Sequence, residues 1–142
     1  MDPILADIFI REAKRTFAFL ESRGFSLQDE AIEITPLLVR IPFLGTNIAI
    51  ILSYDDRAKT VDCSIARVRD GAVVRGRAEG GYWSELYTYL VKRQGFRGSI
   101  GGKDAPVKER IEERLCVELD DYAKALQQHG QAILTDQPGV LP

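Results

Sequence analysis

The spacing of apolar residues changes along the chain and separates helical from extended segments. Apolar residues recur at helical spacing from residue 3 to about residue 23, between an Asp2-Pro3 start and a Gly24 end that are typical of helix termini. Residues 32–65 instead alternate apolar with other side chains, the period of a strand. The alternating positions are Ile32, Ile34, Leu37, Val39, Ile41, Phe43, Ile48, Ile50, Leu52, Tyr54, Val61, Cys63 and Ile65.

Short polar connections between these strands predict their direction. The segment DDRAKT (55–60) is a compact turn, Gly45 separates two strands, and Asp70-Gly71 is typical of a tight hairpin that adds a fifth strand. Such connections leave no room for a crossover, so we expect four to five antiparallel strands. Ala49 and Ile51 are apolar on the other face of the third strand, which should therefore be central.

Helical spacing returns after residue 83. One helix should cover about 84–94 and end at Gly95, with Phe96 folding back onto Val91. On this helix we expect four residues to face the sheet and two tyrosines to point outward: Trp83, Leu86, Tyr87 and Leu90 inward, Tyr82 and Tyr89 outward. A longer helix should run from an Asp104 cap to Gly130 with one continuous apolar stripe.

Together these elements predict a single α+β domain over residues 1–130. Its antiparallel sheet of four to five strands is packed by an N-terminal helix and two C-terminal helices. Residues 131–142 should form a C-terminal extended tail, because Pro138-Gly139 is incompatible with a helix. The apolar residues of the tail leave open whether it docks on the body or on a partner.

Composition restricts the class of protein. The chain has 142 residues, 45% hydrophobic and 28% charged, which is typical of one globular domain. No apolar run approaches the roughly 20 residues of a membrane span, and the first residues lack the pattern of a signal peptide. We therefore expect a cytoplasmic protein that does not enter a membrane.

The glycine-rich stretch GFRGSIGGKD (95–104) resembles a phosphate-binding loop at first sight. Counted back from Gly102-Lys103, a Walker-type loop needs glycine where Arg97 stands and a hydroxyl where Asp104 stands. Such a loop also joins a strand to a helix, whereas this stretch follows a helix. A helix-to-helix connection without a bound nucleotide is the favoured interpretation.

Charge is distributed unevenly. Residues 1–56 hold five bases and nine acids, residues 57–103 ten and four, and residues 104–142 four and eight, within a total of -2. A basic patch in the middle region would suit nucleic acid, although the overall acidity of the chain makes nucleic-acid binding the weaker hypothesis. The candidate patch residues are Arg67, Arg69, Arg75, Arg77, Arg97 and Lys103.

Catalytic and metal-binding patterns are absent from the sequence. The only histidine, His129, falls at a predicted helix end, where an imidazolium favours the helix dipole. Cys63 and Cys116 stand far apart among apolar neighbours, as reduced core cysteines do. We therefore expect no catalytic residue, no metal and no cofactor.

Three stretches resemble a known group of proteins: TFAFLESRGFSL (16–27), ILSYDDR (51–57) and VDCSIARVRDG (61–71). They are similar to small bacterial α+β proteins that include immunity proteins encoded beside polymorphic or contact-dependent growth-inhibition toxins. In that group a helix ending in Phe-Leu-Glu and Gly-Phe precedes an antiparallel sheet with a Tyr-Asp-x-Arg-like turn. The resemblance covers about the first half of the chain.

The resemblance implies a non-catalytic cytoplasmic protein that neutralises a cognate toxin by binding it. Acidic side chains would steer association with a basic toxin and pair with its cations. The candidates, chosen by charge, are Asp55, Asp56, Glu112, Glu113, Asp120 and Asp121. Two alternatives stay open: a regulatory or nucleic-acid-binding module using residues 67–103, and an adaptor resembling a secretion chaperone.

Overall fold

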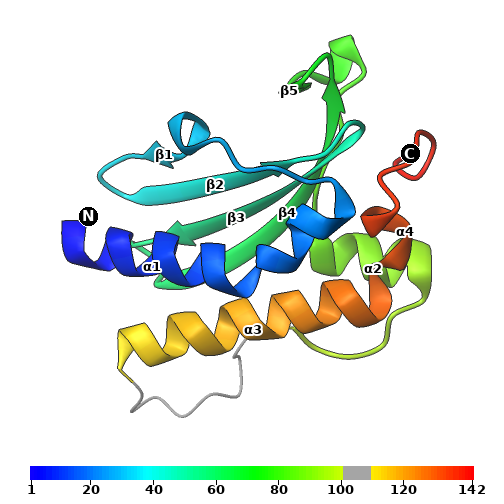
Figure 1. The fold of residues 1–142 in the computed structure, drawn as a ribbon. Helices are drawn as coiled ribbons and strands as arrows, with labels where there is room; N and C mark the ends of the chain where they lie inside the picture. The colour runs from blue at the N-terminus through cyan, green and yellow to red at the C-terminus, as the bar shows by residue number, and fades with distance from the viewer. Residues whose placement is uncertain (101–109) are drawn as a thin grey trace.

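The chain folds as an antiparallel sheet with α-helices packed on one side of it, in a computed structural model that describes residues 1–100 and 110–142 (Figure 1). The predicted α+β class is confirmed. No helix in these two ranges is long and apolar enough to cross a membrane. The elements are α1 (Pro3–Thr16), η1 (Ala18–Arg23), η2 (Asp29–Ala31), β1 (Glu33–Ile34), β2 (Leu38–Leu44), β3 (Ile48–Asp55), β4 (Thr60–Arg69), β5 (Ala72–Val73), η3 (Arg77–Glu79), β6 (Trp83–Glu85), α2 (Leu86–Gln94), α3 (Ile111–His129) and α4 (Gln131–Leu134).

The sheet follows the order of the chain, β1-β2-β3-β4-β5, and β6 also pairs with β4. All pairs are antiparallel. Asp70 and Gly71, with φ of 55° and 78°, form the predicted hairpin turn into β5. Strand β3 is central, and five of its residues in succession are buried, as expected for a strand covered on both faces.

The alternating residues from Val39 to Ile65 form the main core against the helices, whereas Ile34 and Leu37 are exposed. Cross-strand neighbours such as Ile41, Leu52 and Cys63 point to the same side of the sheet and are buried. Helix α1 packs Phe9 on Tyr54, with ring centroids 5.8 Å apart. Helix α3 adds Leu115, Leu119 and Leu126, which are fully buried. At about 25 cal/mol per Å² of apolar surface, this burial is the main stabilising term of the fold.

Glycines end two helical segments as predicted, although the first segment changes type. Helix α1 stops at Thr16, and the 3₁₀ turn η1 continues to Gly24, whose φ of 90° is left-handed. The Phe25 amide then donates to the Leu20 carbonyl at 3.0 Å, and Phe25 is buried. Gly95 ends α2 in the same way, with φ of 68°.

The expected helix start at residue 84 is wrong, because residues 83–85 form the strand β6. Trp83 pairs with Ala66 of β4, so its side chain follows the two-residue period of the sheet and not a helical one. Trp83 is 43% exposed and Tyr87 41% exposed, whereas Tyr89 is buried. The predicted directions of these three aromatic residues are therefore corrected.

The outer edge of β2 is closed. Leu44 exchanges two backbone hydrogen bonds with Ser26, so the N–H of Leu44 points away from β3. The backbone nitrogen of Pro42, two residues earlier, lies on the same edge of β2 but carries no hydrogen to donate. Because β1 and Ser26 occupy the positions on either side, this edge offers little for a further strand to pair with.

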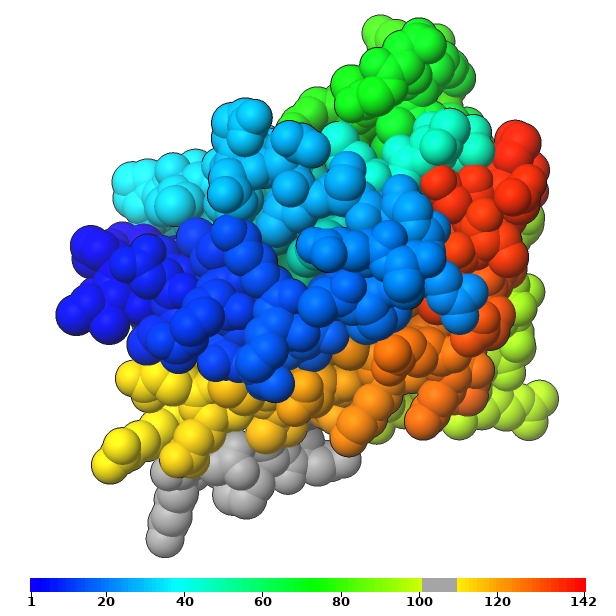
Figure 2. All heavy atoms as spheres, in the orientation of Figure 1, coloured from blue at the N-terminus to red at the C-terminus, as the bar shows by residue number. Residues whose placement is uncertain are grey.

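The C-terminal segment docks on the body, and only part of it is extended. Residues 131–134 form α4, which places Ile133 and Leu134 in the core, and Leu141 is buried further along. The carboxylate of Asp136 accepts three backbone N–H bonds from the β2–β3 turn, from Thr46, Asn47 and Ile48, at 2.5 to 2.9 Å. Figure 2 shows this segment, in red, seated beside the turn.

The close approach of Asp136 explains a glycine in the turn. A Cβ atom at Gly45 would stand 2.5 Å from a carboxylate oxygen of Asp136, too close for any side chain. The tail and the turn are therefore fitted to each other.

We expect Asp136→Ala to lower the free energy of unfolding by about 2 kcal/mol, since hydrogen bonds to a charged group contribute about 1.5 to 3 kcal/mol. Urea denaturation would measure the loss. The control is Asp7→Ala on the exposed side of α1, which should change stability by no more than about 0.5 kcal/mol. Equal effects of the two substitutions would show that the tail contact does not stabilise the fold.

Candidate binding surfaces

The predicted acidic residues of the β3–β4 turn serve the turn itself. Asp55 accepts hydrogen bonds from the backbone N–H groups of Arg57 and Ala58, at 2.8 and 3.1 Å. Asp56 pairs with Lys59 at 2.8 Å, and this hydrogen bond holds the pKa of the Asp56 carboxyl below its usual value. Burial raises the pKa of the neighbouring Tyr54 hydroxyl to about 12, so it donates to Asp56 as a neutral group.

The four acidic residues predicted on α3 do not form one surface. Glu112 and Glu113 are exposed in the first turn of the helix, where carboxylates favour the helix dipole. Asp120 lies near Arg15 of α1, whereas Asp121 is near Glu118, which faces β4. Arg114 donates to the Lys59 carbonyl at 3.3 Å and places the start of α3 beside the β3–β4 turn.

Sequence reasoning missed a buried carboxyl group on the same helix. Glu118 is 9% exposed, and its Oε2 atom accepts no hydrogen bond from any described residue. Burial raises the pKa of Glu118, against a lowering by a hydrogen bond from the Val61 backbone. Burial likewise raises the pKa of Asp62, which lies nearby on β4.

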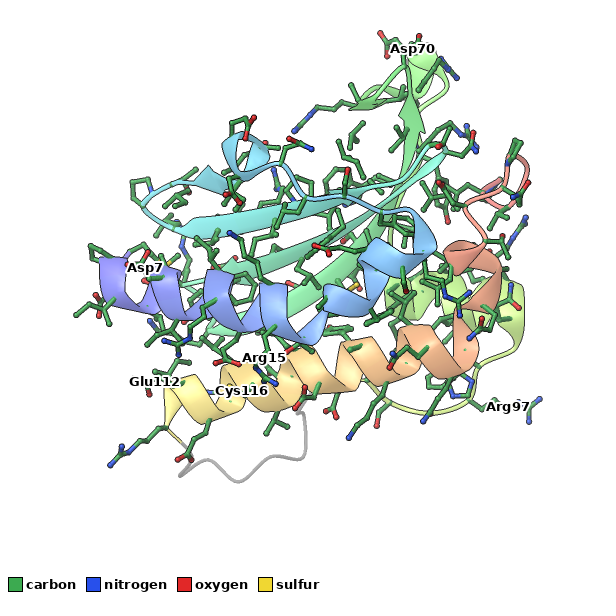
Figure 3. All side chains as sticks on the ribbon, viewed as in Figure 1. Asp7, Arg15, Asp70, Arg97, Glu112 and Cys116 are labelled. Carbon is green, nitrogen blue, oxygen red and sulfur yellow. The ribbon has the colours of Figure 1, made fainter. Side chains whose placement is uncertain are left out.

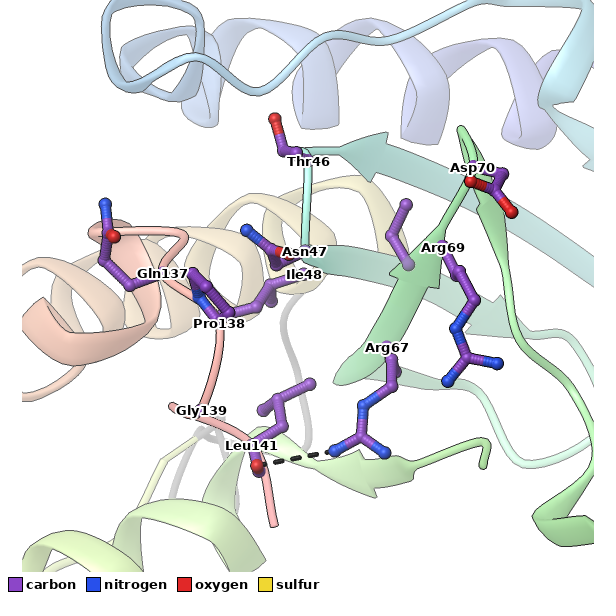
Figure 4. Close-up of a pocket in the computed structure, with 11 residues that line it drawn as sticks. Thr46, Asn47, Ile48, Arg67, Arg69, Asp70, Gln137, Pro138, Gly139 and Leu141 are labelled. Carbon is purple, nitrogen blue, oxygen red and sulfur yellow. Dashed lines mark hydrogen bonds between the residues drawn. The ribbon is translucent and has the colours of Figure 1, made fainter. Parts of the chain in front are cut away.

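Two of the predicted basic residues hold the chain together at one end of β4. Arg67 donates to the Gly80 carbonyl at 2.6 Å and to the carbonyls of Leu141 and Pro142. Arg69 donates to the Glu79 carbonyl at 2.8 Å. Both line a pocket of about 500 Å³ between the β2–β3 turn and the tail (Figure 4). Their hydrogen bonds to backbone carbonyls leave them poorly placed to bind phosphates.

The other predicted basic residues are dispersed. Arg75 pairs with Glu33 at 3.0 Å, and Arg77 is exposed in η3. Arg97 follows α2 at the opposite end of the molecule from Asp70, which marks the β4–β5 hairpin (Figure 3). Lys103 lies outside the described residues, as do Gly101, Gly102 and Asp104 of the glycine-rich stretch. The structure therefore does not bring Arg97 together with the arginines of the sheet.

The face of the sheet opposite the α-helices carries a groove that sequence reasoning did not single out. A small apolar cluster on β3 and β4 is buried under this face: Ala49, Ile51, Ala66 and Val68. A groove of about 400 Å³ reaches this cluster at Ile51 and lies between β1, β2, β5 and Trp83. We call this surface the open-face groove. Its lining residues are Glu30, Ala31, Glu33, Arg40, Pro42, Leu44, Ile51, Gly71, Ala72, Val73, Arg75 and Trp83.

Side chains from distant strands meet across the open-face groove. The guanidinium of Arg40, on β2, lies 5.5 Å from the ring centroid of Trp83, on β6, although β3 and β4 separate the two strands. Glu33 bridges two arginines, with its carboxylate oxygens 3.0 Å from Arg40 and 3.0 Å from Arg75. The Gly80-Gly81 pair just before Trp83 was a signal in the sequence, since glycines commonly mark a turn between two elements.

The two cysteines and the histidine lie in structural surroundings. Burial raises the pKa of both thiols, Cys63 and Cys116, which disfavours the reactive thiolate form. The His129 ring packs on Phe96, with centroids 4.8 Å apart. Across residues 1–100 and 110–142, no three His, Cys, Asp or Glu side chains are grouped so as to hold a metal ion.

No protein-family model matches the chain, and comparisons with curated proteins and with solved structures found no match.

We expect Glu118→Gln to stabilise the protein at pH 7 and to have no such effect below pH 4. The folded state raises the pKa of Glu118 above its ordinary value of 4.5, so ionising this group costs folding free energy as pH rises through that range. The amide cannot ionise and avoids this cost at neutral pH. Thermal unfolding at both pH values would measure the difference.

The matched control for this experiment is Glu113→Gln, an exposed residue of the same helix. It should leave the melting temperature nearly unchanged at both pH values. Destabilisation by Glu118→Gln at pH 7 would contradict the prediction, because it would mean that the ionised carboxylate has a cationic partner.

Proposed function

We propose that this chain is a non-catalytic protein-binding protein that acts through its open-face groove. The observation that carries the proposal is the position of Trp83, the only tryptophan, half exposed over an apolar sheet face and stacked by Arg40. Tryptophan and arginine are enriched among the residues that dominate binding energy at protein interfaces. A protein fold that needed Trp83 only for its core would bury it.

The form of the groove supports a macromolecular partner. Its apolar lining includes Pro42, Leu44, Ile51 and Val73. The ion pairs of Glu33 with Arg40 and Arg75 flank this lining, an arrangement similar to the apolar centre and polar rim of a protein interface. The closed edge of β2 disfavours recognition by strand addition there, so contacts would come from side chains on the open face.

The specific function that we propose is that of a cytoplasmic immunity protein, which neutralises a toxin encoded beside it. The resemblance of residues 16–27, 51–57 and 61–71 to such proteins supports this. Asp55 and Asp56, which we expected to contact the toxin, are engaged in the β3–β4 turn instead. The open-face groove then replaces the acidic residues as the expected toxin-binding surface.

The test is protection of cells that express the toxin domain encoded next to this gene, together with the affinity of the purified pair. We expect Trp83→Ser to abolish protection and to weaken binding by at least about 30-fold, the effect of losing a central hot-spot residue worth about 2 kcal/mol. The control is Tyr87→Ser, an aromatic residue of equal exposure on α2, outside the groove.

Two results would contradict the proposal. Full protection by the Trp83→Ser variant would show that the toxin binds elsewhere than in the open-face groove. A genetic neighbourhood without a toxin, together with tight binding of DNA or RNA at physiological salt, would favour a nucleic-acid-binding function instead.

A further inference from the structure

The charged cluster of the open-face groove holds more hydrogen-bond donors than acceptors. Arg40 and Arg75 both line the groove, and a guanidinium group carries five N–H donors. Among the described residues each of these arginines has one acceptor, and both acceptors are oxygens of the same carboxylate, that of Glu33. Each Glu33 oxygen is thereby engaged with one arginine. The unused capacity of the cluster lies in the two guanidinium groups, which suits a further acceptor.

Apolar side chains share this surface with the arginines. Arg40, Pro42 and Leu44 alternate along β2, so their side chains leave the strand on the same face, that of the groove. Ile51 of β3 pairs with Pro42 and also lines the groove. The guanidinium carbon of Arg40 lies 5.5 Å from the centre of the Trp83 ring, which is another part of the lining. Donors and apolar lining therefore belong to one surface.

Glu33 can be displaced from the arginines at low cost. It belongs to β1, a strand of two residues at the end of the sheet, and its side chain is 43% exposed. Arg40 belongs to a strand that is paired on both sides, and its side chain is 27% exposed and stacked on Trp83. Ion pairs between exposed side chains contribute little to stability, so a competing carboxylate can exchange with that of Glu33.

We propose that the open-face groove binds a partner segment that carries a carboxylate beside apolar side chains, and that this carboxylate takes the place of Glu33 on Arg40 and Arg75. The apolar side chains of the segment would cover Pro42 and Ile51. The inference rests on the proposed function, because it names the chemistry of the partner that the groove accepts. In the free protein, Glu33 is then an internal competitor of that partner.

A cationic partner fits the groove less well. To reach Glu33 it would bring its charge next to two guanidinium groups, and like charges placed together are unfavourable. The other acidic residue of the lining, Glu30, is exposed in η2 and forms no ion pair with another described residue. Removing the charge of Glu30 changes the net charge of the groove without releasing an arginine, so Glu30 supplies a matched control.

The experiment uses the full chain and the fluorescence of Trp83, which reports on the groove because it is the only tryptophan and lines the groove. Three capped peptides are titrated, each with a pair of leucines flanked by glutamate, by glutamine or by lysine. We expect the glutamate peptide to change the emission and to bind at least about tenfold more tightly than the glutamine peptide, with the lysine peptide weakest. Added salt should weaken the glutamate peptide.

Substitutions within the cluster have opposite expected effects. Glu33→Gln should raise the affinity for the glutamate peptide at least about threefold, because both arginines lose their internal acceptor. Arg75→Gln should lower it at least about threefold, because one cationic donor is lost. The control Glu30→Gln should change it by less than about twofold, since solvent and salt screen an exposed charge. A melting curve of each variant verifies that it is folded.

The sign of the Glu33→Gln effect decides the inference. Weaker binding by this variant, an equal effect of Glu30→Gln, or equal binding of the glutamate and glutamine peptides would overturn it. No change in Trp83 emission at about 1 mM glutamate peptide would also overturn it. Tighter binding of an oligothymidylate than of the glutamate peptide would overturn it in favour of nucleic acid.

Failure of this inference is distinguishable from failure of the proposed function. If Trp83→Ser loses toxin binding while Glu33→Gln and Arg75→Gln keep the original toxin affinity, the groove remains the toxin-binding surface and the carboxylate exchange is rejected. If the peptides bind in the expected order but the protein does not protect against the neighbouring toxin, the chemistry of the groove is supported and the immunity function is rejected.

Discussion

Burial of one sheet face by helices from both ends of the chain is the constraint on which the rest of this structure depends. Helix α1 precedes the sheet and α3 follows it, yet both pack on the same side, where Phe9 meets Tyr54 and Leu115 and Leu119 are fully buried. A sheet with one apolar face is stable only if that face is covered. The connections must therefore return the chain to this side after β6, and α2 does so.

Because the helices cover only one face of the sheet, side chains of the sheet itself must shield the other face from solvent. Ala49, Ile51, Ala66 and Val68 are buried there, although the α-helices of the described residues lie on the opposite side (Figure 1). Side chains of the sheet supply the cover: Leu44 and Val73 pack against the cluster, and Arg40 and Trp83 approach each other across β3 and β4. Side chains can be displaced from a surface more easily than a packed helix can, which makes this face suited to exchanging internal contacts for contacts with a partner.

The sequence was sufficient to predict the features that depend on local hydrophobic periodicity and on turn-forming residues. Alternation in residues 39–65 identified the core face of β2, β3 and β4, and Gly24, Gly95 and Asp70-Gly71 marked the turns correctly. It failed at Trp83, because apolar residues at 83, 86, 87 and 90 fit a helix, whereas residues 83–85 all pair with β4. It also left the tail undecided, since Asp136 acts across 90 residues of chain on a turn that no local pattern connects to it.

Charged residues were harder to interpret than apolar ones, because a count of charges does not show which of them the fold uses. Asp55 and Asp56 shape a turn, Arg67 and Arg69 bind backbone carbonyls, and Arg75 pairs with Glu33. A charge that is engaged within the fold gains less from a partner, because its internal hydrogen bonds must first be broken. The charge pattern of the sequence therefore shows where acids and bases are concentrated, whereas the hydrogen bonds of the fold decide which of them are available to a partner.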